Sequence, residues 1–85
     1  MKFIVYILEC VDQSLYTGCT NNLKRRLTEH NNSKRGAHYT KIRRPVKLVY
    51  SEIFKTLAKA RKREQEIKSL SREQKLTLTF RNVLL

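Results

Sequence analysis

The apolar positions divide the chain into short strands and amphipathic helices that are separated by polar segments. Residues 3 to 8 are apolar on both faces apart from the phenol of Tyr6, which is typical of a covered central strand. A polar run at residues 12 to 14 follows, and a second short strand ends in Tyr16-Thr17-Gly18. This pattern predicts a β-hairpin over residues 2–18 with one tyrosine on each strand.

The segment after the hairpin predicts a helix over residues 22–31, because polar capping side chains precede two leucines four positions apart. On a helical wheel, Arg26 lies about 60° from Leu23, and His30 lies between that edge and the apolar face. Arg26 and His30 are therefore expected together at the border of the buried face. The neighbouring Arg25 is interpreted as a surface charge.

Residues 32–45 are polar and basic and follow no regular period, which predicts a long loop. Its cations make this loop an obvious arm for contacting a phosphate backbone. The candidate nucleic-acid-binding residues are Lys34, Arg35, Lys41, Arg43 and Arg44.

A third strand is predicted over residues 46–54, and a C-terminal helix with a tail over residues 71–85, where Ser71 is the expected N-cap. Apolar side chains of a strand alternate between its two faces. Strict alternation places Val46, Leu48 and Tyr50 on one face and Val49 and Ile53 on the other.

A further helix is predicted over residues 56–69, and it carries an acidic residue among its apolar positions. Glu64 projects into the same arc of about 80° as the apolar residues of this helix. A carboxylate that faces the core is costly unless it is paired or binds a cation. Glu64 is therefore either a metal ligand or the partner of Arg61 or Lys68 along its own helix, a weak contact.

These elements predict an α/β (α+β) fold in which a small three-stranded antiparallel sheet is flanked by helices in the order β-β-α-β-α-α. At 85 residues, the chain is expected to form a single domain over residues 1–85. A domain of this size has few large side chains to spare, so most of them are expected to pack in the core.

The charge of the chain indicates a polyanionic partner. Nineteen Lys and Arg residues against seven Asp and Glu residues give a net charge of +12, and nucleic acid is the commonest partner for such a domain. No apolar stretch approaches the length of a membrane span, and the start of the chain lacks the features of a signal sequence. The expected location is cytoplasmic, and no membrane partner is expected.

Cys10 and Cys19 do not form a metal-binding motif. Neither a C-x-x-C nor an H-x-x-x-H spacing links them to His30 and His38. We interpret both as thiols of a reducing compartment, with a disulfide as the alternative.

Five side chains stand out by their positions: Tyr6 and Tyr16 on the hairpin, Arg26 and His30 at the rim of one helix, and Glu64 in the next. They converge if both helices pack on the sheet face that carries the tyrosines. Each also has a simpler explanation, since a cross-strand tyrosine pair is worth about 0.5 kcal/mol and surface charges are common. Their joint placement favours a functional site.

The order of these residues resembles the GIY-YIG nuclease family, and the resemblance extends along nearly the whole chain. Small stand-alone bacterial proteins built of little besides this domain are the most similar. The matching segments are Val5-Tyr6-Ile7 for the first motif, Tyr16-Thr17-Gly18 for the second, residues 19–31, His38-Tyr39-Thr40, Arg44-Pro45 and the helix with Ala60, Glu64 and Ile67-Lys68.

The resemblance implies a metal-dependent endonuclease that hydrolyses DNA phosphodiester bonds to 5′-phosphate and 3′-hydroxyl ends, with structure-specific DNA repair or processing as a role. Glu64 would hold one divalent cation, Mg²⁺ or Mn²⁺. Tyr6 would accept the proton of the attacking water with its pKa lowered by nearby cations, and His30 would share this task or orient the water. Arg26 would neutralise charge on the phosphate, and Tyr16 would hydrogen-bond it.

The chain departs from the family pattern at two positions. The first motif lacks the Gly-Ile that usually precedes its tyrosine, and Gln13 stands where a turn glycine is usual. Asn82 is the candidate for an asparagine that many family members carry late in the chain. None of these departures removes a group that the chemistry needs.

Two alternatives to an enzyme are open: a nucleic-acid-binding module that keeps the nuclease fold without cleavage, and an adaptor that docks onto a larger repair or replication complex. The charge is equally compatible with RNA, and DNA is favoured through the resemblance. The residue pattern does not define an oligomeric state, since no exposed apolar stripe is evident.

Overall fold

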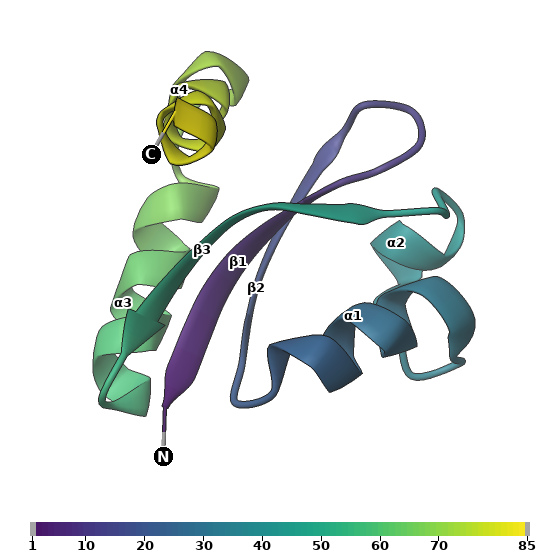
Figure 1. The fold of residues 1–85 in the computed structure, drawn as a ribbon, viewed down its shortest axis with the longest axis horizontal. Helices are drawn as coiled ribbons and strands as arrows, with labels where there is room; N and C mark the ends of the chain where they lie inside the picture. Colours follow the sequence, from purple (N-terminus) through teal and green to yellow (C-terminus); the bar gives the residue numbers. More distant parts are fainter. Residues whose placement is uncertain (1, 85) are drawn as a thin grey trace.

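A computed structural model of the chain describes residues 2–84, with side chains as far as Thr79. Figure 1 shows a small twisted sheet with α1 on one side and α3 on the other, and α4 crossing the end of α3. The elements follow the order β1 Phe3–Glu9, β2 Leu15–Thr20, α1 Leu23–Asn32, α2 His38–Lys41, β3 Lys47–Phe54, α3 Leu57–Lys68 and α4 Arg72–Leu84. The predicted α+β class is confirmed, with one helix, α2, added to the expected order.

β1 is the central strand of the sheet, as its continuous apolar sequence predicts. The strand order is β2-β1-β3, and both pairings are antiparallel. Tyr6 lies opposite Gly18 of β2 and Ser51 of β3. Because helices cover both faces of β1, residues 5–8 are all buried, including the phenol.

The sheet separates two apolar clusters, and α1 and α3 lie on opposite faces of it. On one face Val5 and Ile7 pack against Ala60 and Ile67 of α3. On the other face Tyr6, Leu8, Cys10 and Val46 pack together, and the leucines of α1 cover them. The condition that both helices pack on the tyrosine face is therefore not met: α3 lies on the other face of the sheet (Figure 1), where it packs against Val5 and Ile7.

A bulge changes the faces of β3 that strict alternation predicted. Ile7 pairs with Tyr50 and Leu8 pairs with Leu48, so Val49 has no opposite residue. As a result Val49 and Tyr50 both pack against the cluster of Val5 and Ile7, while Leu48 is partly exposed. The prediction that Val46, Leu48 and Tyr50 share one face is wrong for this reason.

The predicted starts of the helices are confirmed by their caps. Asn22 accepts a hydrogen bond from the backbone N–H of Arg25 at 3.0 Å, and Thr56 accepts one from the N–H of Lys59 at 3.2 Å. At α4, the hydroxyl of Ser71 accepts from the backbone N–H of Gln74 while the Gln74 side chain accepts from the N–H of Ser71. α4 extends to Leu84, so Asn82 lies on this helix, but its side chain is outside the described residues.

The segment predicted as a long basic loop contains the short helix α2 and is held to the end of α1 by Arg44. Nε of Arg44 donates to the carbonyl of His30 at 2.6 Å, and Nη2 donates to those of Glu29 at 3.1 Å and Ser33 at 2.5 Å. The last carbonyls of a helix have no partner within it, so a guanidinium fork is an effective C-terminal cap. Gly36 makes this close approach sterically feasible, because an added Cβ would lie 2.6 Å from the Glu29 carbonyl oxygen.

The structure contains no helix within residues 2–84 that is long and apolar enough to cross a bilayer.

The hairpin turn contains a strained residue at the position where the sequence lacks the usual glycine. Gln13 has φ of 69°, while Asp12 accepts hydrogen bonds from the backbone N–H and the hydroxyl of Ser14. We expect Gln13→Gly to raise the free energy of unfolding by about 1 kcal/mol, because glycine adopts this conformation without a Cβ clash. Gln13→Ala is the control and should bring no such gain in urea denaturation; equal stabilisation by both variants would contradict the strain.

Candidate active site

The side chain of Tyr6 lies over Gly18, its cross-strand neighbour. A Cβ added at Gly18 would overlap the phenol oxygen and lie 2.6 Å from Cζ of Tyr6. Only glycine therefore leaves room for this ring position, which explains in steric terms why the second tyrosine motif ends in glycine. The pairing of these two strand residues places the Tyr6 hydroxyl at the edge strand β2.

The Tyr6 hydroxyl belongs to a buried chain of hydrogen bonds. Its oxygen lies 2.8 Å from Nε2 of His30, and Nδ1 of His30 lies 2.8 Å from Oγ1 of Thr40. Thr40 Oγ1 in turn donates to the carbonyl of Ala37 at 2.9 Å. Tyr6 is 1% exposed, and His30 and Thr40 are fully buried. A buried phenol needs a polar partner for its hydroxyl, and His30 supplies it.

Burial keeps the side chains of Tyr6 and His30 neutral at neutral pH. Burial raises the pKa of Tyr6 to about 12, with Tyr16 adding to the effect of burial and Arg26 opposing it. Burial lowers the pKa of His30 to about 4, and the positive charge of Arg26 acts in the same direction. Arg26 therefore acts in the predicted direction, lowering the pKa of Tyr6, but burial outweighs it and the pKa is raised.

Tyr16 is held by an aromatic stack that the sequence pattern did not predict. Its ring centroid lies 6.0 Å from that of Tyr39 at an interplanar angle of 28°, and 5.1 Å from the ring of His30. The guanidinium of Arg43 covers Tyr39 with its carbon 3.9 Å from the ring centroid, and also pairs with Asp12 at 3.1 Å. The helix α2 thus contacts Tyr16 directly through Tyr39, and it is linked to Tyr6 indirectly, through Thr40 and His30 of α1.

A pocket of about 560 Å³ brings four of the five predicted site residues together. It is lined by Tyr6 and Tyr16 from the hairpin, Arg26 from α1 and Glu64 from α3. The fifth, His30, lies behind Tyr6 and is not part of the pocket wall. The pocket spans the edge strand β2, and its remaining lining residues are Phe3, Gly18, Cys19, Thr20, Asn21, Arg25, Glu29, Leu57 and Arg61.

Arg26 is oriented by two hydrogen bonds at the rim of the pocket. Its Nη1 donates to Glu29 at 3.0 Å and to the carbonyl of Arg35 at 2.8 Å. The side chain is about one-quarter exposed, so its charge is available to a ligand in the pocket. Arg25, which the sequence indicated as a plain surface charge, also lines this pocket, as does Arg61. The pocket therefore has a positive rim suited to an anion.

Glu64 is buried, as its place among the apolar positions of α3 predicted. It is 5% exposed, and its two oxygens contact Arg61 at 3.2 Å and Lys68 at 2.9 Å. Both alternatives raised by the sequence thus stay open, because Glu64 is paired along its own helix and also faces the pocket. Arg61 and Lys68 are 62% and 46% exposed, so they can turn away from the carboxylate without unfolding the helix.

The donor set of the pocket fits a divalent cation that keeps most of its water ligands. Within residues 2–79, no group of three or more His, Cys, Asp and Glu side chains forms a ready metal site. A single carboxylate such as Glu64, completed by water and a substrate phosphate, suits Mg²⁺ or Mn²⁺. Cys10 and Cys19 are free thiols, and neither forms a zinc site with the histidines.

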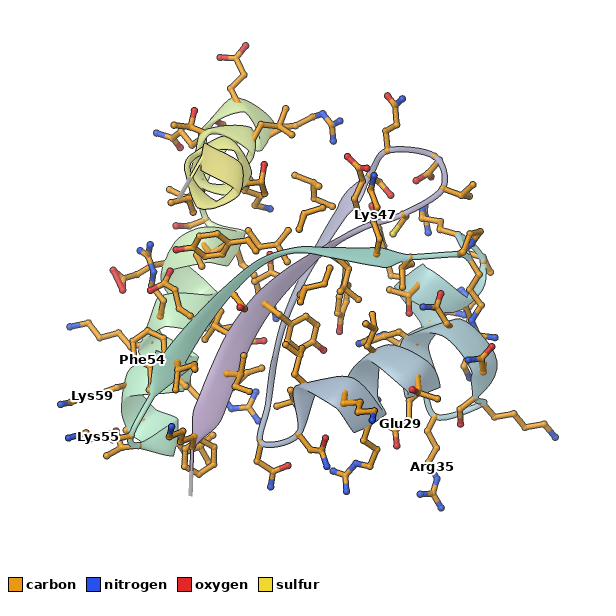
Figure 2. The ribbon with its side chains drawn as sticks, viewed as in Figure 1. Glu29, Arg35, Lys47, Phe54, Lys55 and Lys59 are labelled. Carbon is orange, nitrogen blue, oxygen red and sulfur yellow. The ribbon has the colours of Figure 1, made fainter. Side chains whose placement is uncertain are left out.

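The five basic residues that we predicted to bind nucleic acid have different environments. Lys34 and Arg35 are exposed, and Figure 2 shows Arg35 projecting outward from the segment after α1. Arg43 and Arg44 are half-buried and engaged in the internal contacts described above, and Lys41 is half-buried at the end of α2. Lys34 and Arg35 are therefore the two members of this set whose side chains are most accessible to a phosphate backbone.

Thr40 and Tyr39 belong to a segment that matches the family pattern, but neither residue was predicted to have a role in the site. The segment around them is polar and too short to show helical periodicity, so nothing in the pattern indicated that one side chain would be buried beside His30. The signal that could have found them is the buried histidine itself, since its second ring nitrogen requires a partner.

The chain matches a known class of catalytic domain. Residues 2–77 match the family described as the GIY-YIG catalytic domain, and the chain belongs to this family, which implies a nuclease-type fold. The chain is similar to small bacterial UPF0213 proteins: one from Syntrophus aciditrophicus is 56% identical over 81 residues, covering 95% of this chain and 93% of that protein. One from Staphylococcus saprophyticus is 54% identical over 77 residues, covering 91% of this chain and 93% of that protein.

Two solved structures share the fold. The solution NMR structure of a UPF0213 protein from Bacillus halodurans is 45% identical with a TM-score of 0.59, covering 92% of this chain and 82% of that chain. The solution NMR structure of a protein from E. faecalis is 41% identical with a TM-score of 0.68, covering all of this chain and 90% of that chain.

The lowered pKa of His30 predicts a loss of stability in mild acid. The unfolded chain takes up a proton near pH 6.5 and the folded chain only near pH 4, so the stability is complete above pH 6.5 and is lost as the pH falls between these values. We expect the free energy of unfolding to drop by about 2 kcal/mol between pH 7 and pH 5 in urea titrations.

His30→Asn is expected to flatten this pH dependence, whatever its effect on stability at pH 7. His38→Asn is the matched control, because His38 is exposed, and it should keep the wild-type slope. An unchanged slope in His30→Asn would show that another group is responsible.

Proposed function

We propose that this protein is a metal-dependent nuclease that hydrolyses phosphodiester bonds in DNA. The observation that carries the proposal is the pocket in which Tyr6, Tyr16, Arg26 and Glu64 converge from the hairpin and two helices, with His30 hydrogen-bonded to the Tyr6 phenol. Membership of the GIY-YIG family supports this chemistry, and the net charge of +12 supports a polyanionic substrate.

Tyr6 and His30 together provide a route for the proton of the attacking water. A neutral phenol is a poor base, but it accepts a proton from water if its own proton passes to Nε2 of His30, 2.8 Å away, at the same time. His30 then carries the proton as an imidazolium with Nδ1–H still bonded to Thr40. Because its pKa is low, His30 readily gives the proton back once the phosphate has reacted.

Arg26 and Tyr16 are placed to hold the reacting phosphate. The Arg26 guanidinium is fixed by Glu29 and by a backbone carbonyl, so it meets the growing negative charge without having to be ordered first. Tyr16 has a ring fixed by Tyr39 and a hydroxyl able to donate to a phosphate oxygen. The positive rim formed with Arg25 and Arg61 strengthens this attraction.

Glu64 is the residue that would hold the divalent cation. A bound Mg²⁺ or Mn²⁺ supplies Lewis acidity at the scissile phosphate and stabilises the leaving 3′-oxygen. The carboxylate would be released for this role when the exposed side chains of Arg61 and Lys68 turn towards solvent or towards the phosphates of the substrate.

A non-cleaving nucleic-acid-binding module is the second candidate. It is favoured by one observation, the pairing of both Glu64 oxygens with basic side chains of the same helix. In that case Glu64 stabilises α3 and the pocket binds phosphate without reaction. The two candidates differ in what the loss of the Glu64 charge changes.

We expect Glu64→Gln to lower metal-dependent cleavage of labelled DNA at least about a hundredfold while DNA affinity is retained. The assay uses single strands, duplexes, flaps and junctions with Mg²⁺, with Mn²⁺ and with a chelator. Glu66→Gln, an exposed charge on the same helix, is the matched control and should cleave like wild type. Wild-type binding without cleavage of any substrate would instead support the binding module.

We place the nucleic-acid contact partly on Lys34 and Arg35, which lie in the segment after α1. Replacing both with Ala should make the slope of log K against log salt shallower by about 2, since each phosphate contact contributes close to one. Lys55→Ala/Lys59→Ala is the matched control, because it removes the same charge from the opposite side of the molecule (Figure 2). Equal slopes for the two variants would contradict this placement.

A further inference from the structure

We propose that Thr40 is a positioning residue that fixes His30 in the Nδ1–H tautomer and so keeps Nε2 free to accept the proton of Tyr6. The proposal rests on the nuclease function proposed above for its catalytic consequence. The tautomer itself follows from the hydrogen-bond geometry of the buried chain and can be measured without any substrate.

A hydroxyl group has a single proton, and this fixes the direction of the hydrogen bonds. Thr40 Oγ1 lies 2.9 Å from the carbonyl oxygen of Ala37, which can only accept, so the hydroxyl proton points to Ala37. Towards Nδ1 of His30, 2.8 Å away, Thr40 can then only accept, and Nδ1 must carry a proton.

The other ring nitrogen is then an acceptor. Burial, together with the charges of Arg26 and Arg44, opposes a positive charge on His30, so the ring is neutral and has one proton only. With that proton on Nδ1, the lone pair of Nε2 faces the Tyr6 hydroxyl at 2.8 Å, and Tyr6 donates. Protons in this chain are thus directed from Tyr6 towards His30, which is the direction that the proposed reaction needs.

No water molecule can take the place of Thr40 as the hydrogen-bond partner of His30. His30 and Thr40 are both fully buried, so water does not replace the Thr40 hydroxyl as a partner. The opposite arrangement, with Thr40 donating to Nδ1, would put the proton on Nε2 and make His30 the donor to Tyr6. In that arrangement Tyr6 could not pass its proton to the ring, so the position of one proton decides whether the pair is productive.

The tautomer is read from the ring ¹⁵N chemical shifts of histidine-labelled protein carrying His38→Gln, which leaves only the His30 signals. In this background we expect a protonated Nδ1 and an unprotonated Nε2 at pH 7. Thr40→Val, which has nearly the same shape but no hydroxyl, should shift the ring towards the Nε2–H tautomer. Thr40→Ser should restore the original pattern.

The same two variants, Thr40→Val and Thr40→Ser, are expected to differ in DNA cleavage. Thr40→Val should lower kcat at least about tenfold with little change in KM, and Thr40→Ser should stay within about twofold of wild type. If these substitutions acted only by loosening the fold, the activity of each variant would fall in proportion to its loss of stability, which urea denaturation measures in parallel.

Two results would overturn the proposal: an Nε2–H tautomer in the protein that retains Thr40, or an unchanged Nδ1–H tautomer in folded Thr40→Val. If Thr40→Val does not fold, the tautomers of the protein that retains Thr40 and of the Thr40→Ser variant still decide the matter. If the tautomers are as expected and no DNA is cleaved, the proposed function fails while the role of Thr40 in fixing the ring stands.

Discussion

A phenol buried in the central strand of a small sheet requires a hydrogen-bond partner, and the arrangement of α1 and α2 satisfies this requirement. Tyr6 is almost completely covered, and His30 meets its hydroxyl from the last turns of α1. His30 in turn needs a partner for its second nitrogen, which Thr40 of α2 supplies. These hydrogen bonds thus tie α1 to the central strand and α2 to α1.

The same contacts divide the site into a buried part with a fixed geometry and an exposed part that carries charge. The residues that we propose to handle the proton are buried, whereas the charged residues Arg26 and Arg61 line the pocket with partial exposure. A buried, fully bonded network keeps a fixed geometry, and exposed charges remain free to exchange partners with a phosphate or a cation. The division suits a site in which proton positions must be fixed and the substrate is a flexible polyanion.

Most of the fold was predictable because it follows from periodicity and capping. The central strand, the caps at Asn22 and Thr56, and the buried position of Glu64 are each local features of the sequence. The packing of α1 and α3 on opposite faces was not predicted, since alternate residues of β1 are apolar on both faces and do not indicate which helix covers which. The bulge at Val49 is likewise set by pairing with β1 rather than by its own sequence.

The register of the hairpin also has a consequence for how such a sequence can vary. Gly18 lies under the Tyr6 ring, so a larger residue at position 18 is acceptable only if position 6 loses its ring or the strands shift. A shift by one residue would turn Tyr6 to the face of α3 and remove it from His30. The two tyrosine motifs, although separated along the chain, therefore form one steric unit, and a change in either motif alters the space available to the other.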